Sequence, residues 1–196
     1  MAIRRVLTEP PWSSREPAEG ELVLRGRTAS ELWGFGQHPS TSLCLSILCG
    51  LYSEDGPRPQ RAIELACGSG LLCVAAAKLG AASVIGVEED AAARELTEEN
   101  ARRNGAHVRA QSGFADLEGD LALANLDAAQ LLARAGEIAK LAPRGHLLAA
   151  GFVEEEREEV EQRFLALGFR LLYREAREGF IATVFKARAG DARASA

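Results

Sequence analysis

From Arg61 onward, short apolar segments alternate with longer segments whose apolar residues recur at helical spacing. The short segments are rich in Val, Ile, Leu and Ala and are bounded by turn residues, which is typical of buried strands. This pattern predicts strands over 61–66, 83–88, 107–111, 121–126 and 146–153, and helices over 71–80, 91–104, 127–141 and 154–167. Strands that alternate with helices form a parallel sheet with helices on both faces.

The last part of the chain departs from this alternation. Segments 169–176 and 180–187 both have strand character, and only three residues separate them. Two strands so close together pair in antiparallel fashion, as a hairpin. We therefore expect an α/β fold with a doubly wound, Rossmann-like, seven-stranded sheet that is mostly parallel and has an antiparallel C-terminal hairpin strand.

The chain divides into three parts on this interpretation. Residues 1–30 form an irregular N-terminal arm, residues 31–188 form the main domain, and residues 189–196 form a disordered tail. A segment just ahead of another predicted helix, "WGFGQHPST" at 33–41, combines glycines, aromatic residues, a histidine and a proline.

Composition narrows the possible functions. The chain has 196 residues, of which 47% are hydrophobic, and this suits one globular domain. The net charge is −5 and no block rich in Lys or Arg occurs, so we expect no nucleic-acid partner. No apolar run is long enough to cross a bilayer, which predicts a soluble, cytoplasmic protein without membrane contact. The four cysteines lie in apolar segments without the paired spacing of a zinc site, so we expect buried thiols and no metal.

The stretch "IELACGSG" at 63–70 is the most informative chemically. It places Glu64 near the end of the first strand of the alternating pattern, followed by a turn with Gly68 and Gly70. In doubly wound sheets, ligands bind beyond the carboxyl ends of the strands, and a glycine turn there allows close approach of the backbone. Glu88 ends the next strand, 18 residues after Gly70, where a carboxylate would meet the hydroxyls of a ribose.

The residues of the turn exclude two common nucleotide-binding motifs, and this narrows the choice of ligand. The dinucleotide pattern G-x-G-x-x-G/A would need Gly or Ala at the position of Cys73, and no Walker A loop is present. Glu64 would repel a pyrophosphate but suits a cationic group. S-adenosylmethionine carries an ammonium, a sulfonium and a ribose, so it fits both carboxylates. The alternative is an ordinary strand–helix turn with a surface glutamate.

These residues resemble a known family. The stretch "IELACGSGLLCVAAAKLGAASVIGVEED" is similar to the cofactor-binding half of class I S-adenosylmethionine-dependent methyltransferases. Four further stretches resemble the ribosomal-protein lysine methyltransferase family called PrmA. "WGFGQHPST" is similar to its FGTGTHPTT, "LALANLDAAQLL" to its V-A-N-[IL], "LAPRG" to its L-x-P-G-G, and "EGF" to its GEW. The resemblance runs from about Trp33 to Arg188.

The resemblance implies roles for particular residues. The stretch "WGFGQHPST" at 33–41 is called the opening stretch below. The cofactor would be held by residues of this stretch, of the glycine turn and of the later strand ends: Trp33, Thr41, Glu64, Ala66, Gly68, Gly70, Glu88, Gly113, Phe114 and Asn125. Glu64 and Gly68 would line the methionine end, Glu88 the ribose, and Gly113 and Phe114 the adenine. Asn125 would lie beside the methyl group as the catalytic residue. Ala66 departs from the family, since a glycine is usual there.

The opening stretch is interpreted as a flexible gate over the cofactor. Gly34 and Gly36 permit unusual backbone angles, and Pro39 stiffens the entry to the helix. Trp33 and Phe35 could instead simply fill gaps in the core. His38 is a minor candidate for a general base.

We therefore expect an S-adenosylmethionine-dependent enzyme that methylates a protein lysine or amino group. Asn125 would orient the amine. The alternatives are a small-molecule N- or O-methyltransferase, a cofactor-binding protein without catalysis and, more distantly, an NAD-dependent oxidoreductase. The family's recruiting domain has no counterpart in the arm, which is expected to lie over the open end of the sheet or on the gate.

Overall fold

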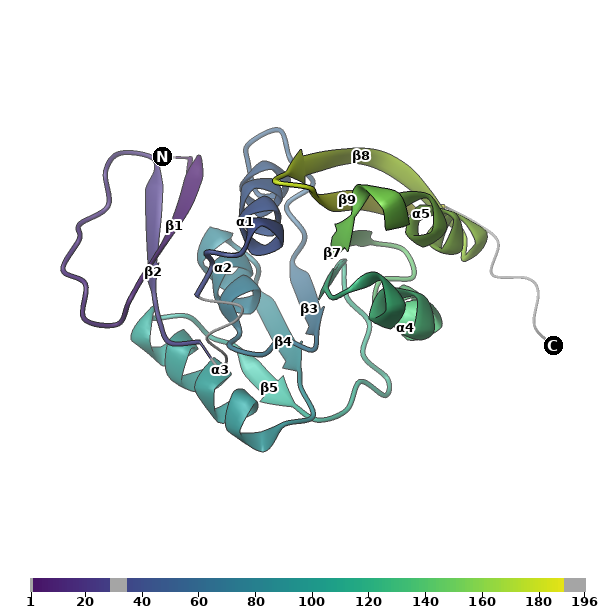
Figure 1. The fold of residues 1–196 in the computed structure, drawn as a ribbon. Coiled ribbons are helices and arrows are strands. Elements are labelled where there is room, and N and C mark those ends of the chain that lie inside the picture. Colours follow the sequence, from purple (N-terminus) through teal and green to yellow (C-terminus); the bar gives the residue numbers. More distant parts are fainter. Residues whose placement is uncertain (1, 29–34, 189–196) are drawn as a thin grey trace.

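The structure is a computed structural model that describes residues 2–28 and 35–188 (Figure 1). Its elements run in chain order as follows: β1 Arg5–Glu9, β2 Glu21–Arg25, α1 Pro39–Leu51, β3 Arg61–Leu65, α2 Leu71–Leu79, β4 Ser83–Val87, α3 Ala91–Arg103, β5 Arg109–Gln111, β6 Leu121–Asn125, α4 Ala128–Leu141, β7 His146–Val153, the 3-10 turn η1 Glu154–Glu156, α5 Arg157–Ala166, β8 Phe169–Arg177 and β9 Phe180–Ala187. The main sheet has seven strands, in the order β5-β4-β3-β6-β7-β9-β8.

This strand order confirms the predicted fold. The strands β5, β4, β3, β6 and β7 are parallel, and the sheet grows in opposite directions from β3 and from β6. Such a reversal leaves a crevice beyond the carboxyl ends of the two central strands. The hairpin completes the sheet: β9 pairs antiparallel with both β7 and β8 and lies between them.

Helices cover both faces of the sheet, as the alternating pattern predicts. One hydrophobic cluster joins α1 and α2 to one face, and a second cluster joins α4 and α5 to the other. Short polar side chains set where several helices begin. Asp90 accepts a hydrogen bond from the Ala93 amide at 3.0 Å before α3, and Asp127 accepts one from the Gln130 amide at 2.8 Å before α4.

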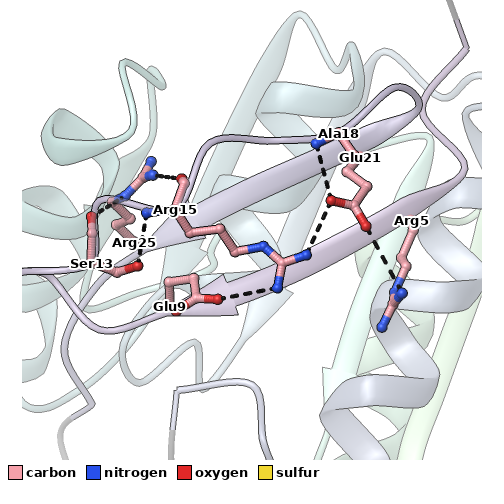
Figure 2. Close-up of polar contacts among 7 residues, drawn as sticks. All are labelled: Arg5, Glu9, Ser13, Arg15, Ala18, Glu21 and Arg25. Atoms are coloured by element: carbon pink, nitrogen blue, oxygen red, sulfur yellow. Dashed lines mark hydrogen bonds and ion pairs between the residues drawn. The ribbon is translucent and has the colours of Figure 1, made fainter.

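The N-terminal arm is more regular than the sequence indicates, so the prediction of an irregular segment was wrong. β1 and β2 form a parallel two-stranded sheet in which Arg5 pairs with Glu21 and Glu9 with Arg25. Figure 2 shows how the connection between them is braced. Arg15 lies 3.7 Å from Glu9 and 3.3 Å from Glu21, so one guanidinium ties the connection to both strands.

Two asparagines, one in α3 and one that caps its end, attach this arm to the domain. Asn104 accepts a hydrogen bond from the Arg25 amide at 2.8 Å and donates one to the Arg25 carbonyl at 2.7 Å. Asn100, which is fully buried, accepts from the Arg27 amide at 3.0 Å and donates to the Ser69 carbonyl at 2.9 Å. The arm is therefore bonded, through one side chain, to the glycine turn after β3.

A buried glutamate with two partly exposed arginines joins α5 to the hairpin. Glu161 is 5% exposed, and its carboxylate accepts two hydrogen bonds from Arg174 at 3.0 Å, one from Arg157 at 3.2 Å and one from Thr183 at 3.1 Å. Each carboxylate oxygen therefore has two donors, which is the condition for a charge to be tolerated in the interior.

The cysteines behave as expected. All four are free and buried, and burial raises the pKa of the Cys44 and Cys73 thiols. Among the residues described, no helix combines the length and the apolar character needed to cross a membrane.

Candidate active site

A cavity of about 350 Å³ opens beyond the carboxyl ends of β3 and β6, at the reversal point of the sheet. Five of the residues predicted for the site line it: Thr41, Glu64, Ala66, Gly68 and Asn125. These come from the start of α1, from β3 and its turn, and from the end of β6. Segments far apart in the sequence thus meet at one cavity.

Glu64 lies at the buried wall of this cavity. Its side chain is on β3 and is only 4% exposed, and its carboxylate accepts a hydrogen bond from the Cys73 amide at 2.9 Å. Burial raises the pKa of Glu64 to about 7, and the neighbouring charge of Glu88 adds to the rise. A cation that enters the cavity would meet a carboxylate with few other partners, and it would favour the charged form.

The turn after β3 uses left-handed backbone angles at three positions. Ala66 has φ +53°, Gly68 +55° and Gly70 +70°. A Cβ at Gly68 would meet no atom within 4 Å, so this glycine faces open space, as a close approach to a ligand requires. A Cβ at Gly70 would lie 2.4 Å from the Thr97 side chain, so packing against α3 requires glycine at this position.

Glu88 is next to the turn but is not among the residues that line the cavity. Its carboxylate accepts hydrogen bonds from the Gly68 amide at 3.0 Å and the Asp90 amide at 3.1 Å. One oxygen therefore holds the backbone of the glycine turn, and the proposed contact with a ribose stays a prediction.

Asn125 and Thr41 form a pair inside the cavity. The Asn125 amide donates a hydrogen bond to the Thr41 hydroxyl at 3.1 Å. This bond fixes the plane of the carboxamide, so that its oxygen can accept a hydrogen bond from another molecule. The pair joins the end of β6 to the start of α1, which are 84 residues apart in sequence.

The opening stretch touches both the arm and the hairpin. Gly36 has φ +81°, and a Cβ there would lie 2.4 Å from the Thr8 side chain of β1. His38 caps α1 by accepting from the Ser40 amide, and its ring lies edge-on to Phe180 with the centroids 4.6 Å apart. Burial lowers the pKa of His38, and the structure gives this residue a capping role. Trp33 lies outside the described residues, whereas Phe35 is buried in the core.

The two residues predicted to contact the adenine lie outside the lining of the cavity. Gly113 and Phe114 follow the end of β5, and the Gln111 side chain donates a hydrogen bond to the Gly113 carbonyl. Phe114 packs on the core cluster of α4 and α5, and neither residue lines the cavity. Their role stays a prediction.

The cavity also contains residues that the sequence did not point to. They are Thr28, Cys67, Ser69, Leu71, Leu72, Leu126, Asp127, Gln130 and Gly151, and Gly36 of the predicted gate lines the cavity beside them. Gly151 could have been singled out from the sequence, because a glycine inside an apolar strand marks a bulge or a close approach of backbone. It has φ +102°, and a Cβ there would lie 2.4 Å from the Leu126 carbonyl oxygen. No group of three or more metal-ligating side chains occurs within residues 2–28 and 35–188.

Comparison with known proteins shows the family of the chain. The sequence profile of the family described as ribosomal protein L11 methyltransferase (PrmA) matches residues 2–188. The chain belongs to the PrmA family. The PrmA match includes β1 and β2, so the arm is part of the region that the family shares.

Curated PrmA relatives match most of this chain. The ribosomal protein L11 methyltransferase of Syntrophotalea carbinolica is 35% identical over 170 residues, which is 84% of this chain and 55% of the relative. That of Pelotomaculum thermopropionicum is 38% identical over 161 residues, which is 78% of this chain and 50% of the relative. The chain therefore spans about half the length of the curated relatives it matches.

Solved structures show the same fold. A crystal structure of ribosomal protein L11 methylase from Lactobacillus delbrueckii subsp. bulgaricus has a TM-score of 0.80 at 23% identity, covering 96% of this chain and 97% of that chain. Magnesium protoporphyrin IX methyltransferase from Synechocystis, solved with bound S-adenosylmethionine, has a TM-score of 0.58 at 18% identity, covering 74% and 78%.

Proposed function

We propose that this chain is an S-adenosylmethionine-dependent methyltransferase that acts on an amino group of a protein. The observation that carries the proposal is the cavity itself. It brings the buried Glu64 carboxylate, the open turn at Gly68 and the Asn125–Thr41 pair together at the reversal point of the sheet. Membership of the PrmA family supports the same activity.

The residues present fit the cofactor. Glu64 offers a buried negative charge to the ammonium of the methionine end, and Gly68 leaves open the space that a side chain would fill. Glu88 lies beside the same turn, and each of its carboxylate oxygens accepts one backbone amide and can accept a further hydrogen bond from the ribose. When bound, the cofactor supplies a methyl group that is already activated by its sulfonium.

The protein's own contribution is then to position the acceptor and exclude water. A lysine amine has a pKa of about 10.4 in water and must lose a proton before it can act as a nucleophile. A desolvated cavity favours the neutral amine. The Asn125 oxygen would accept a hydrogen bond from that amine, while Thr41 holds the carboxamide in place. This arrangement orients the amine without requiring a strong base.

The acceptor is the finer part of the proposal. The curated relatives are named for ribosomal protein L11, so this protein is the first acceptor to test. The opening stretch contacts Thr8 of β1, so the arm lies against the gate and can contribute to acceptor recognition. A small-molecule amine is the alternative outcome of the same test.

Two measurements test the proposal. Isothermal titration with S-adenosylmethionine, S-adenosylhomocysteine and NAD should show binding of the first two only. Transfer of a labelled methyl group should then be followed into purified ribosomal protein L11, and into the protein and small-molecule fractions of a lysate. Label in protein supports the proposal, and label in the small-molecule fraction alone would show that the acceptor is a small molecule. Binding without any transfer would leave a cofactor-binding protein.

The variant Asn125→Ala separates catalysis from binding. Losing an orienting hydrogen bond at the reacting centre is expected to lower kcat/KM by about 10- to 1,000-fold, with cofactor affinity nearly unchanged. Gln162→Ala, at an exposed position of α5 that does not line the cavity, serves as a control. If Asn125→Ala weakens cofactor binding as much as turnover, Asn125 is a cofactor ligand and has no separate role in orienting the acceptor.

A further inference from the structure

Asn100 of α3 does not line the cavity, yet its side chain bonds to two segments that adjoin it. The side chain is fully buried. Its carboxamide donates hydrogen bonds to the Ser69 carbonyl and the Arg27 carbonyl, each at 2.9 Å, and accepts one from the Arg27 amide at 3.0 Å. Both N–H groups of the carboxamide are therefore used, and one side chain holds the glycine turn and the arm together.

Both attachment points lie at the cavity. Ser69 belongs to its lining, and so does Thr28, the residue that follows Arg27 in the arm. Because Asn100 bonds to the amide and the carbonyl of Arg27, it also fixes where Thr28 meets the cavity.

The arm reaches Asn100 closely because glycine occupies position 26. A Cβ at Gly26 would lie 2.7 Å from the carboxamide oxygen of Asn100 and 2.4 Å from the ring of Phe35. The end of the arm thus packs against both α3 and the opening stretch, without room for a side chain. In an interior packed this tightly, the arm cannot move independently of Asn100.

Two neighbours of Asn100 each make only one of its two attachments among the bonds described. Thr97, also fully buried, donates a hydrogen bond to the Gly68 carbonyl of the glycine turn at 3.0 Å. Asn104 holds the arm through the amide and the carbonyl of Arg25. Asparagine is a weaker helix former than alanine or leucine, so helix formation does not explain Asn100 inside α3, whereas its bonds to both segments do.

We infer that Asn100 is a positioning residue that couples cofactor binding at the glycine turn to the placement of the arm at the cavity. The inference rests on the proposed function, because it takes S-adenosylmethionine as the ligand of the turn. When the cofactor fixes the turn, the bonds of Asn100 hold Arg27 more firmly, and Thr28 is then in place when the acceptor arrives. Coupling between two sites is reciprocal, so loss of this link also weakens cofactor binding.

Hydrogen exchange of the wild-type protein measures the coupling. We expect saturating S-adenosylhomocysteine to slow the exchange of the β2 amides about threefold to tenfold, the range expected for one hydrogen bond. No residue of β2 lines the cavity, so direct contact with the ligand does not account for such slowing. Strand β8, at the far edge of the main sheet, is the internal reference and should be unaffected.

The outcomes of this measurement are distinct. Binding of S-adenosylhomocysteine without any change in β2, or with equal slowing in β2 and β8, would overturn the coupling and leave the proposed function standing. No binding of S-adenosylhomocysteine would remove the proposed function, and this inference with it.

Three variants assign the coupling to Asn100. Asn100→Ala, which favours the helix, should weaken S-adenosylhomocysteine binding about threefold to tenfold and abolish the slowing in β2. Asn104→Ala is the matched control, because it also loses bonds to the backbone of the arm. It should speed exchange in β2 but keep the affinity and the ligand-dependent slowing.

Thr97→Val removes the hydroxyl that bonds to the turn and keeps the size of the side chain. This variant should weaken binding while the slowing in β2 persists, because the link through Asn100 is intact. Slowing that survives in Asn100→Ala, or that disappears equally in Asn104→Ala, would refute the role of Asn100. If Asn100→Ala does not fold, the comparison of β2 with β8 in the wild type still decides whether the coupling exists.

Discussion

Replacing Glu64 by glutamine should stabilise the protein, and the gain should grow with pH. A glutamate in the unfolded chain titrates near 4.5, whereas burial raises the pKa of Glu64 in the folded protein to about 7. Because the folded-state pKa is the higher one, the stability that protonated Glu64 provides is complete below pH 4.5. It is lost as pH rises through 7. The difference of about 2.5 pH units corresponds to about 3–4 kcal/mol in full, at about 1.4 kcal/mol per unit.

Glutamine keeps an oxygen that can accept the hydrogen bond from the Cys73 amide but has no charge to bury. Urea unfolding at intervals from pH 4.5 to 8 measures the effect. The free energy of unfolding of Glu64→Gln minus that of the wild type should rise by about 3 kcal/mol over this range. Glu89→Gln, at an exposed position, is the control and should show little change. A difference for Glu64→Gln that does not vary with pH would refute the reasoning.

The same variant connects stability to ligand binding. If Glu64 meets the ammonium of the cofactor, binding favours its charged form, and the wild type should lose cofactor affinity as pH falls below about 7. Glu64→Gln should bind weakly at every pH. Equal cofactor affinity in the wild type and in Glu64→Gln would show that Glu64 does not bind the cofactor.

Three further changes test the packing around the site. Ala66→Gly should raise the free energy of unfolding by about 0.5–1 kcal/mol in urea, because glycine tolerates φ +53° better than alanine; a loss of stability would contradict this. Gly70→Ala should lower it by about 2–4 kcal/mol because the new Cβ would lie 2.4 Å from Thr97; an unchanged unfolding midpoint would show that the turn adapts freely. Glu161→Ala should lower it by about 1–3 kcal/mol, because the buried Thr183 hydroxyl loses its acceptor while the partly exposed arginines can turn to water; an unchanged free energy would show that these bonds do not stabilise the fold.

The order of the strands and helices could be predicted from the sequence because apolar residues are spaced differently in strands and in helices. The alternation from β3 onward and the hairpin of β8 and β9 are local patterns, and they fix the topology of a doubly wound sheet. The 3-10 turn at Glu154–Glu156 shortens the last predicted helix at its start, which is a boundary effect.

The arm could not be predicted because its two strands depend on each other. β1 and β2 are parallel and joined by 11 residues with three prolines, so neither strand has a neighbour in sequence that reveals its partner. Its stability comes from long-range bonds, such as those of Asn100 and Asn104 to the backbone near Arg25 and Arg27. Polar residues inside a helix pattern give no sign of such a role.

The site was partly predictable, because some of its residues follow from the topology of the sheet. Residues at strand ends, such as Glu64 and Asn125, follow from the topology, because the carboxyl ends of neighbouring parallel strands meet at one edge. The two glycines of the turn look equivalent in sequence, yet Gly68 faces the cavity and Gly70 faces Thr97. Only packing distinguishes them, and packing depends on where α3 lies.

The position of β9 between β7 and β8 has a consequence for synthesis of the protein. β8 leaves the ribosome first, but its neighbour in the sheet is β9, so it has no edge to join until residues 180–187 follow. The nascent chain therefore carries an exposed edge on β7 and an unpaired strand until β9 has been synthesised, a period in which strands tend to aggregate. Termination between Arg177 and Phe180 removes β9 and leaves β8 without a partner in the sheet, so we expect the truncated product to be degraded rather than to persist as a smaller folded domain.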